Sequence, residues 1–200
     1  MMGGLFPGHR MCAGGDRVIL CIFTATSIDY PAMFHSTAIA ASDKHIFYAE
    51  LDKQLAGLLA GERNFIANAA NLSSLVFLML PDLNWAGFYL MRGSDLLLGP
   101  FQGKPACVRI AVLPHPRGVC GAAAYQRKTQ LVANVHDFPG HIACDSASNS
   151  EIVVPLIMNG TVIGVLDIDS PLLNRFDHDD QAGIEQLVRT FLDLTDPPPM

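Results

Sequence analysis

Charged and aromatic side chains are scarce in this sequence, and no apolar run is long enough to cross a bilayer. Of the 200 residues, 16% are charged and 8% are aromatic, and tryptophan occurs once. The apolar run at 18–23 is far shorter than the roughly 20 residues that a membrane-spanning helix needs. Hydrophobic residues still make up 50% of the chain, which is enough for a core and excludes a disordered protein. We expect one folded domain of ordinary size and no membrane partner.

A block of basic residues is also absent. Lysine and arginine total 13 against 19 aspartates and glutamates, for a net charge of −6, which argues against nucleic acid as a partner. The chain contains no P-loop, no G-x-G-x-x-G and no G-x-S-x-G. A kinase, a Rossmann dehydrogenase and an α/β-hydrolase therefore have no support from motifs.

Cysteines are too few for a disulfide scaffold. There are 5 of them, and an odd number cannot all pair within one chain. A reducing compartment fits this content, so we expect a cytoplasmic protein. Its thiols are then either small buried hydrophobes or groups that take part in chemistry.

The first forty residues differ from the remainder of the chain. They are rich in Gly, Ala and Met and show no helical or strand periodicity. A signal peptide is one interpretation, because Arg17 precedes an apolar stretch. Acidic residues interrupt that tract and it comes late, so we favour a disordered extension or a true start at Met33. The predicted boundaries are an extension over 1–41, which contains Cys12 and Cys21, a folded domain over 42–195 and a tail over 196–200.

Helical spacing opens the predicted domain, and strand patterns follow from Trp85. Asp43 can cap a first helix that Gly61 ends. A second helix is nearly all apolar and is therefore expected to be buried. Asn159-Gly160 between two apolar runs predicts a type I′ hairpin. The second helix is expected over 65–80, and further helices over 118–127 and 177–194. Strands are expected over 85–91, 96–101, 108–112, 130–133, 151–158 and 161–169, the last two of which form the hairpin. This order predicts an α+β fold, with a central antiparallel sheet of about six strands and helices packed on it.

Three cysteines of the predicted domain lie beside turns or loops. Cys144 lies in a polar loop over 134–150 and close to His141, where a thiol can be exposed and partly ionised. Cys120 is near the start of a predicted helix, whose dipole would lower the pKa of the thiol. Cys107 precedes a strand. Any one of them could be a buried hydrophobe, but a thiol oxidised in each turnover needs a resolving partner, and the domain has two candidates.

Three carboxylates form a second group. Asp167 and Asp169 lie two apart near the end of one hairpin strand and so point to the same face. Glu151 starts the other strand and can approach them. Clustered acids repel, which raises at least one pKa and lets a carboxylic acid donate a proton near neutral pH. Such a cluster could also hold an ammonium ion, or it could be an ordinary exposed strand end.

Trp85 and Tyr89 lie four residues apart on one predicted strand and so face the same side. Such aromatics commonly pack in a core. They could instead form the wall of a pocket for a small apolar group.

A zinc site is a competing interpretation of the polar loop. The spacing H-x4-H-x2-C matches no common zinc finger, so we expect no metal. The possible ligands are His136, His141 and Cys144, with Asp137 or Asp145.

Six segments of the chain closely resemble free methionine-(R)-sulfoxide reductase, a family of catalytic GAF domains. They are NWAGFY at 84–89, LGPFQGK at 98–104, RGVCG at 117–121, HIACD at 141–145, ASNSE at 147–151 and GVLDIDS at 164–170. The resemblance covers about residues 43–194 and implies a single GAF-like domain. It further implies reduction of free L-methionine (R)-S-oxide to methionine, with thioredoxin as the reductant, a homodimer and no cofactor.

The resemblance also implies residue roles. Cys144 is similar to the thiol that attacks the sulfoxide sulfur, Cys107 to the resolving thiol, and Cys120 to a third cysteine that some members use for attack. The acids resemble groups that hold the amino group and protonate the sulfoxide oxygen, and the aromatics resemble walls around the methyl group. These residues are Glu151, Asp167 and Asp169, and Trp85 and Tyr89.

Two departures from the family pattern stand out. Residues 1–41 have no counterpart, and the segment 111–117 is about three residues longer than the usual link between Cys107 and Cys120.

A GAF module that only binds a small molecule is an alternative, although such a module needs no trio of cysteines.

Overall fold

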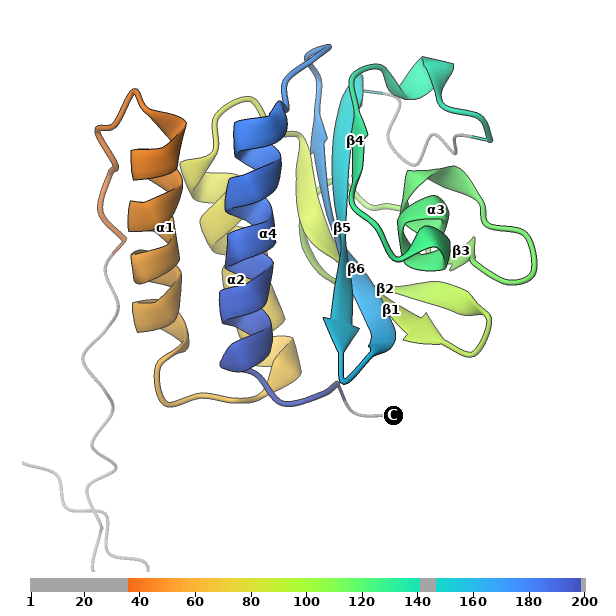
Figure 1. The fold of residues 1–200 in the computed structure, drawn as a ribbon, viewed down its shortest axis with the longest axis horizontal. Helices are drawn as coiled ribbons and strands as arrows, with labels where there is room; N and C mark the ends of the chain where they lie inside the picture. Colours follow the sequence, from red (N-terminus) through yellow and green to blue (C-terminus); the bar gives the residue numbers. More distant parts are fainter. Residues whose placement is uncertain (1–35, 141–146, 199–200) are drawn as a thin grey trace, which may run out of the picture. The chain divides into compact units, whose positions relative to one another are not determined.

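A six-stranded antiparallel sheet organises the part of the chain that the structure describes (Figure 1). The structure is a computed structural model that describes residues 36–140 and 147–198. The strand order is β3-β2-β1-β6-β5-β4. The strands are β1 (Trp85–Arg92), β2 (Asp95–Gly103), β3 (Arg109–Ala111), β4 (Gln130–Val132), β5 (Ser150–Met158) and β6 (Thr161–Ser170).

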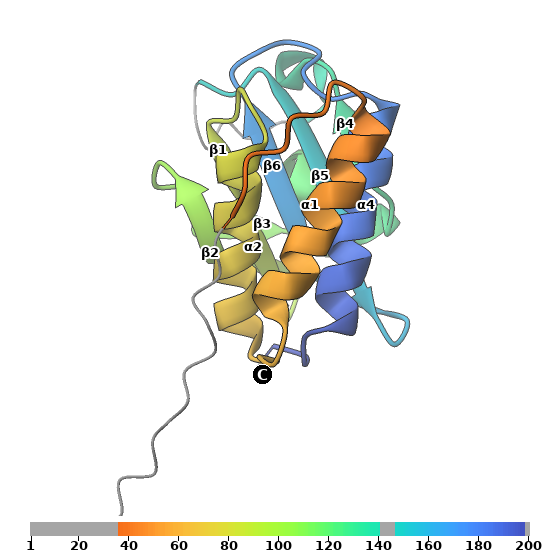
Figure 2. The same cartoon turned by 90° about the vertical axis from the view of Figure 1, so that its left-hand side faces the viewer.

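Helices cover the two faces of this sheet unequally. One face packs against α2 (Phe65–Met79) and α4 (His178–Asp193), and α1 (Lys44–Leu59) packs on these two helices. Figure 2 shows these three helices side by side in front of the sheet. The other face carries α3 (Gly118–Gln126) over β5 and β6. The predicted α+β architecture, with one antiparallel sheet and helices packed on it, is confirmed.

Polar side chains begin the helices where the sequence predicts them. The Asp43 carboxylate accepts a hydrogen bond from the Ile46 amide at 3.1 Å. The Asn64 side chain accepts one from the Ala67 amide at 3.1 Å. Asp177 begins α4 with a capping box that is completed by Asp180. Each cap satisfies an amide that the first helical turn leaves without a partner.

The larger core lies between the sheet and the three-helix face. At its centre, Phe65 of α2 and Phe191 of α4 meet at 5.3 Å between ring centroids, and Phe191 lies 5.1 Å from Phe88 of β1. All three side chains are buried. The alternate residues of β1 therefore separate into this core and the opposite face, as the period of two along a strand requires.

The β5–β6 hairpin matches its prediction from the sequence, whereas α2 matches its prediction only in part. The β5–β6 hairpin turns at Asn159 and Gly160 with φ of 49° and 74°, which fits the predicted type I′ turn. The expectation that the second helix is buried is wrong in part, since Ile66, Phe77 and Leu78 are exposed. Only one side of α2 meets the sheet, and an apolar residue at nearly every position does not indicate which side that is.

Residues 36–41 lead into α1 without regular secondary structure. The Thr37 amide donates to Gln54 Oε1 at 3.1 Å, and Gln54 Nε2 donates back to the Thr37 carbonyl at 2.9 Å.

Cys12, Cys21, His141, Cys144 and Asp145 lie outside the described residues. Among the helices that the structure does describe, none combines the length and the apolar character needed to cross a membrane.

Candidate active site

The register of the central strands brings the three predicted acids together. Glu151 of β5 pairs directly with Asp169 of β6, and Asp167 lies two positions further along β6. All three side chains therefore share the sheet face that carries α3. Glu151 and Asp167 are buried, at 6% exposure each, and Asp169 is half-buried. The prediction that hairpin pairing would gather these acids is confirmed.

Helix α3 places a thiol against this cluster. Cys120 Sγ lies 3.1 Å from Asp167 Oδ2 and 4.0 Å from Glu151 Oε1. The close approach depends on Gly121, where a Cβ atom would lie 2.7 Å from the Ala111 carbonyl oxygen. Ala123 and Ala124 are also buried, so small side chains let α3 pack closely on the sheet.

Burial gives the cluster unusual acidities. Burial and the negative charge of Asp167 raise the pKa of Glu151 well above its usual range. Burial raises the pKa of Asp167 to about 6, while the hydrogen bond from Cys120 opposes that rise. At neutral pH the cluster therefore retains a proton on a carboxyl group, as a general acid requires.

One oxygen of the cluster is left for a ligand. Within the described part of the chain, Asp167 Oδ1 is buried and has no hydrogen-bond partner. A buried carboxylate oxygen without a partner costs free energy, because it has lost its hydration. A bound ammonium group or a hydroxyl donor would satisfy it.

An aromatic wall stands beside the acids. Trp85 of β1 is stacked on Tyr89, with 5.8 Å between the ring centroids, and on Phe101 of β2, with 5.3 Å between them. Gly87 lies between the two β1 aromatics and opposite Asp167, and a Cβ atom there would overlap Phe101 and lie 2.7 Å from the Trp85 ring. The prediction that Trp85 and Tyr89 share a face is confirmed. The sequence did not identify Phe101 and Gly87 as parts of the site, although a glycine inside an apolar strand is a signal for close packing.

The polar atoms of the wall hold the chain segment that follows β2. Trp85 Nε1 donates to the Lys104 carbonyl at 3.1 Å, and the Tyr89 hydroxyl donates to the Cys107 carbonyl at 3.0 Å. Cys107 is half-buried and disulfide-bonded, whereas Cys120 is a free thiol, so these two cysteines are not joined to each other. The hydrogen bond from Tyr89 holds the backbone of Cys107 beside the aromatic wall, because Tyr89 is stacked on Trp85.

The environment of Cys120 differs from the sequence expectation. The start of a helix predicts a lowered thiol pKa. Instead, burial and the negative charges of Asp167 and Glu151 raise the pKa of Cys120. The side chain is only 3% exposed, because α3 faces the sheet rather than solvent at this position. Neighbouring charges and lost hydration therefore outweigh the helix dipole.

The candidate zinc ligands are only partly described. His136 and Asp137 are exposed, and His136 Nε2 contacts Asn149 Oδ1 at 3.1 Å. Among the described side chains, the group whose ligand atoms lie close enough for a cation is instead Cys120, Glu151 and Asp167, within 4.8 Å of one another. This group needs no metal to account for its contacts, since the thiol and the carboxyl groups hydrogen-bond to one another.

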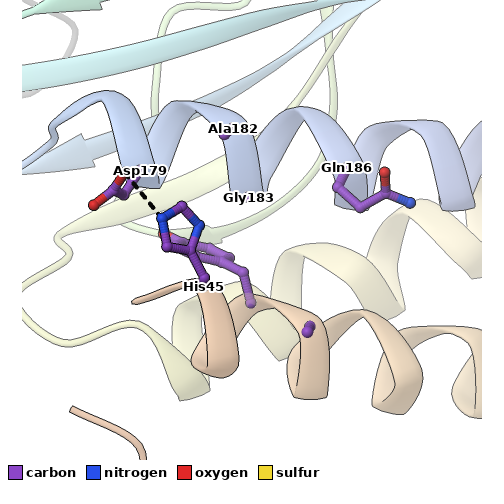
Figure 3. Close-up of a pocket in the computed structure, with 7 residues that line it drawn as sticks. His45, Asp179, Ala182, Gly183 and Gln186 are labelled. Carbon is purple, nitrogen blue, oxygen red and sulfur yellow. Dashed lines mark ion pairs between the residues drawn. The ribbon is translucent and has the colours of Figure 1, made fainter. Parts of the chain in front are cut away.

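A hollow between α1 and α4 lies on the opposite side of the sheet (Figure 3). His45 and Asp179 face each other across it at 3.6 Å, and Gln186 lines it further along α4. Gly183 allows the Tyr48 ring to lie directly on α4. None of the predicted site residues lines this hollow.

Comparisons with known proteins agree with the fold. The family model described as "GAF domain" matches residues 73–192, so the chain is a GAF-domain protein. The free methionine-R-sulfoxide reductase of Escherichia coli is 53% identical over 146 residues, which are 73% of this chain and 87% of that protein.

Two solved structures support the same conclusion. The free methionine-R-sulfoxide reductase of Neisseria meningitidis, in complex with its substrate, is 40% identical with a TM-score of 0.76, over 81% of this chain and 95% of that one. The fRMsr of Staphylococcus aureus in its reduced form is 46% identical with a TM-score of 0.71, over 80% of this chain and 99% of that one. The chain belongs to the free methionine-R-sulfoxide reductase family, whose members are oxidoreductases.

Proposed function

We propose that this protein reduces free L-methionine (R)-S-oxide to L-methionine. The observation that carries the proposal is a buried, proton-retaining pair of carboxyl groups, Glu151 and Asp167, beside an aromatic wall that is hydrogen-bonded to the backbone of Cys107. Membership of the reductase family supports the same substrate.

The acids would bind and activate the substrate. A protonated carboxyl group donates to the sulfoxide oxygen, which makes the sulfur electrophilic. An ionised carboxylate of the cluster accepts the substrate ammonium group, for which Asp167 Oδ1 is an available acceptor. Trp85 and Tyr89 would contact the methyl group. Recognition of the ammonium group favours a free amino acid over a peptide-bound residue, whose nitrogen is an uncharged amide.

Three thiol steps complete the proposed cycle. The Cys144 thiolate attacks the sulfoxide sulfur and forms an S–S bond, while an acid of the cluster protonates the sulfoxide oxygen. The hydroxyl group then transfers from the substrate sulfur to the Cys144 sulfur as the S–O and S–S bonds to the substrate break, which leaves methionine and a sulfenic acid on Cys144. The Cys107 thiol then attacks that sulfenic acid, which releases water and forms a Cys107–Cys144 disulfide. The dithiol of thioredoxin reduces this disulfide and becomes oxidised in turn.

A coupled assay tests the function. Purified protein is mixed with NADPH, thioredoxin reductase, thioredoxin and one of three substrates: free (R)-sulfoxide, free (S)-sulfoxide or N-acetylated (R)-sulfoxide. We expect NADPH consumption with the free (R)-sulfoxide alone. No consumption by folded protein would contradict the proposal, and tight sulfoxide binding without turnover in the presence of a dithiol would favour a binding-only GAF module.

Variants at each cysteine test the assigned roles. Cys144→Ser is expected to lose turnover and sulfenic acid formation. Cys107→Ser should release one equivalent of methionine per chain and then stop with thioredoxin as the reductant. Turnover that survives Cys144→Ser would move the attacking role to Cys120.

Oligomeric state, metal content and domain limits are separate expectations. We propose a homodimer, and sedimentation of the purified protein tests it. Metal analysis tests the zinc alternative, since a structural site would give about one zinc per chain. Limited proteolysis tests the proposed folded domain over 42–195.

A further inference from the structure

Cys120 contacts the acid cluster without having a role in the proposed thiol chemistry. Its Sγ lies 3.1 Å from Asp167 Oδ2, which is within hydrogen-bond distance for a sulfur donor, and 4.0 Å from Glu151 Oε1. The shorter contact therefore selects Asp167 as the acceptor. Because α3 is packed closely on β3 through Gly121, the thiol is held at this position by the backbone.

The surroundings of this thiol oppose its ionisation. Cys120 is only 3% exposed, and the Asp167 and Glu151 carboxyl groups are its nearest charged neighbours. A thiolate here would repel those anions and would have lost its hydration. Attack on a sulfoxide requires a thiolate, so the same surroundings make Cys120 a poor nucleophile and a stable hydrogen-bond donor.

The bond distinguishes the two oxygens of Asp167. Oδ2 accepts from Cys120, whereas Oδ1 is buried and has no partner among residues 36–140 and 147–198. A donor on Oδ2 restricts rotation of the carboxylate and leaves Oδ1 as the oxygen that meets a ligand. It also stabilises the ionised form, against the burial that favours the protonated one.

We propose that Cys120 is a positioning residue: its protonated thiol donates to Asp167 Oδ2, orients this carboxylate and keeps it ionisable, and does not attack the substrate. This inference rests on the proposed function only for the identity of the ligand. The contact with Asp167 exists in the protein without substrate.

Titration of Asp167 in the absence of substrate tests this role. The groups that face Asp167 are Tyr89 from β1, Glu151 from β5, Asp169 from β6 and Cys120 from α3. In Cys120→Ala the carboxylate loses the thiol donor, while the other three groups stay and its hydrogen bonds with Glu151 and with the Ile168 backbone remain. We expect the apparent pKa of Asp167, followed through its carboxyl ¹³C resonance, to rise by about one pH unit. The resonance is assigned with Asp167→Asn.

Cys120→Ser is the matched control. Serine keeps a donor and is, like alanine, smaller than cysteine, so both variants lose similar packing volume. We expect Cys120→Ser to return the apparent pKa to within about 0.3 units of the wild-type value. An unchanged pKa in Cys120→Ala, or equal shifts in both variants, would overturn the proposal.

Alkylation of the wild-type chain needs no substitution. Reduced protein is treated with iodoacetamide at pH 8, and the modified cysteines are followed by peptide mass spectrometry. We expect Cys120 to react about 100-fold more slowly in the native protein than in guanidinium chloride, because it is buried and protonated. Native and unfolded rates that agree would overturn the proposal.

These two measurements require no turnover, so an inactive wild-type protein would refute the proposed function and leave this inference standing. In an active enzyme, single-turnover trapping of the sulfenic acid gives a third readout. We expect the sulfenic acid on Cys144 and not on Cys120. A sulfenic acid on Cys120 would make it the attacking thiol and overturn its positioning role.

Discussion

Two buried aspartates, one on each side of the sheet, have opposite surroundings. Asp180 near the start of α4 is 1% exposed and accepts hydrogen bonds from the Tyr48 hydroxyl at 2.8 Å, from Lys44 Nζ at 2.6 Å and from the Asp177 amide at 3.0 Å. Asp167 is 6% exposed and lies among acids and a thiol, and one of its oxygens has no partner among the residues that the structure describes.

The difference separates an acid that stabilises the fold from one that is available for chemistry. Asp180 joins α1 to α4 through cationic and neutral donors, which compensate its burial. Burial raises the pKa of Asp167 to about 6. A raised carboxyl pKa in a cluster beside an aromatic wall is typical of a functional site.

Removal of the compensated acid is expected to have the largest effect on stability. Asp180→Ala leaves Lys44, the Arg175 guanidinium and the Tyr48 hydroxyl without their shared acceptor. We expect the free energy of unfolding to fall by about 3–4 kcal/mol in urea denaturation. Asp179→Ala, at an exposed neighbouring position, is the control and should change it by no more than about 0.5 kcal/mol. Equal losses in the two variants would show that the contacts of Asp180 do not stabilise the fold more than those of an exposed acid.

Removal of the uncompensated acid is expected to stabilise the protein at alkaline pH. The pKa of Asp167 is about 6 in the folded chain against an ordinary 3.8, so the folded state binds more protons between these values. The free energy of unfolding therefore falls as the pH rises through this interval, and the full loss is present above about pH 6. At pH 8, Asp167→Asn should be about 2–3 kcal/mol more stable than wild type, and at pH 3 the two should be nearly equal. A variant less stable at pH 8 would contradict this sign. Reductase activity should be lost.

Tyr48 beside Asp180 and Tyr89 beside Asp167 each donate one hydrogen bond through the hydroxyl group, so the two sides of the sheet can be compared by removing that group. Tyr48→Phe removes a donor to the Asp180 carboxylate, and Tyr89→Phe removes a donor to the Cys107 carbonyl. We expect unfolding losses of about 2 and about 1 kcal/mol, because a charged acceptor gains more from a hydrogen bond. Only Tyr89→Phe should slow formation of the disulfide after single-turnover oxidation. Equal disulfide rates in both variants would remove this role from Tyr89.

The smallest effect is expected from the exposed cap of α4. The hydrogen bond from Lys44 lowers the pKa of Asp177 to about 2. Its stabilising contribution is therefore present above about pH 4 and is lost as the pH falls toward 2. Asp177→Asn keeps a capping side chain and loses only a solvent-screened charge, so we expect a change below about 0.5 kcal/mol at pH 7 and 0.1 M salt. A loss above 1 kcal/mol would indicate that the Lys44 pair is not screened.

Local sequence patterns were sufficient for most of the fold. The Asp43 cap, the Asn159-Gly160 turn and the apolar runs predicted the elements with ends within about two residues of the observed ones. These signals act over a few neighbouring residues and need no knowledge of distant contacts. The exposed side of α2 could not be predicted, because its apolar residues surround the helix and the sheet alone selects the buried side.

The acids of the site could be predicted for a related reason, and the thiol could not. The hairpin that places Glu151 opposite Asp169 is encoded by a turn and two alternating strands. The contact of Cys120 with Asp167 joins residues 47 positions apart through the packing of α3 on the sheet. The sequence showed a cysteine at a helix start and suggested a lowered pKa, whereas the burial and the facing carboxylates raise it.

The sequence by itself determined the α+β architecture, the hairpin that gathers the acids and the resemblance that identified the family. Tertiary structure alone decided which carboxylate oxygen is left without a partner, that Tyr89 holds the backbone of Cys107, and that Cys120 is a buried donor. The physical reason is that turns, caps and strand alternation are local, whereas desolvation and the charge facing a buried group depend on every element packed against it.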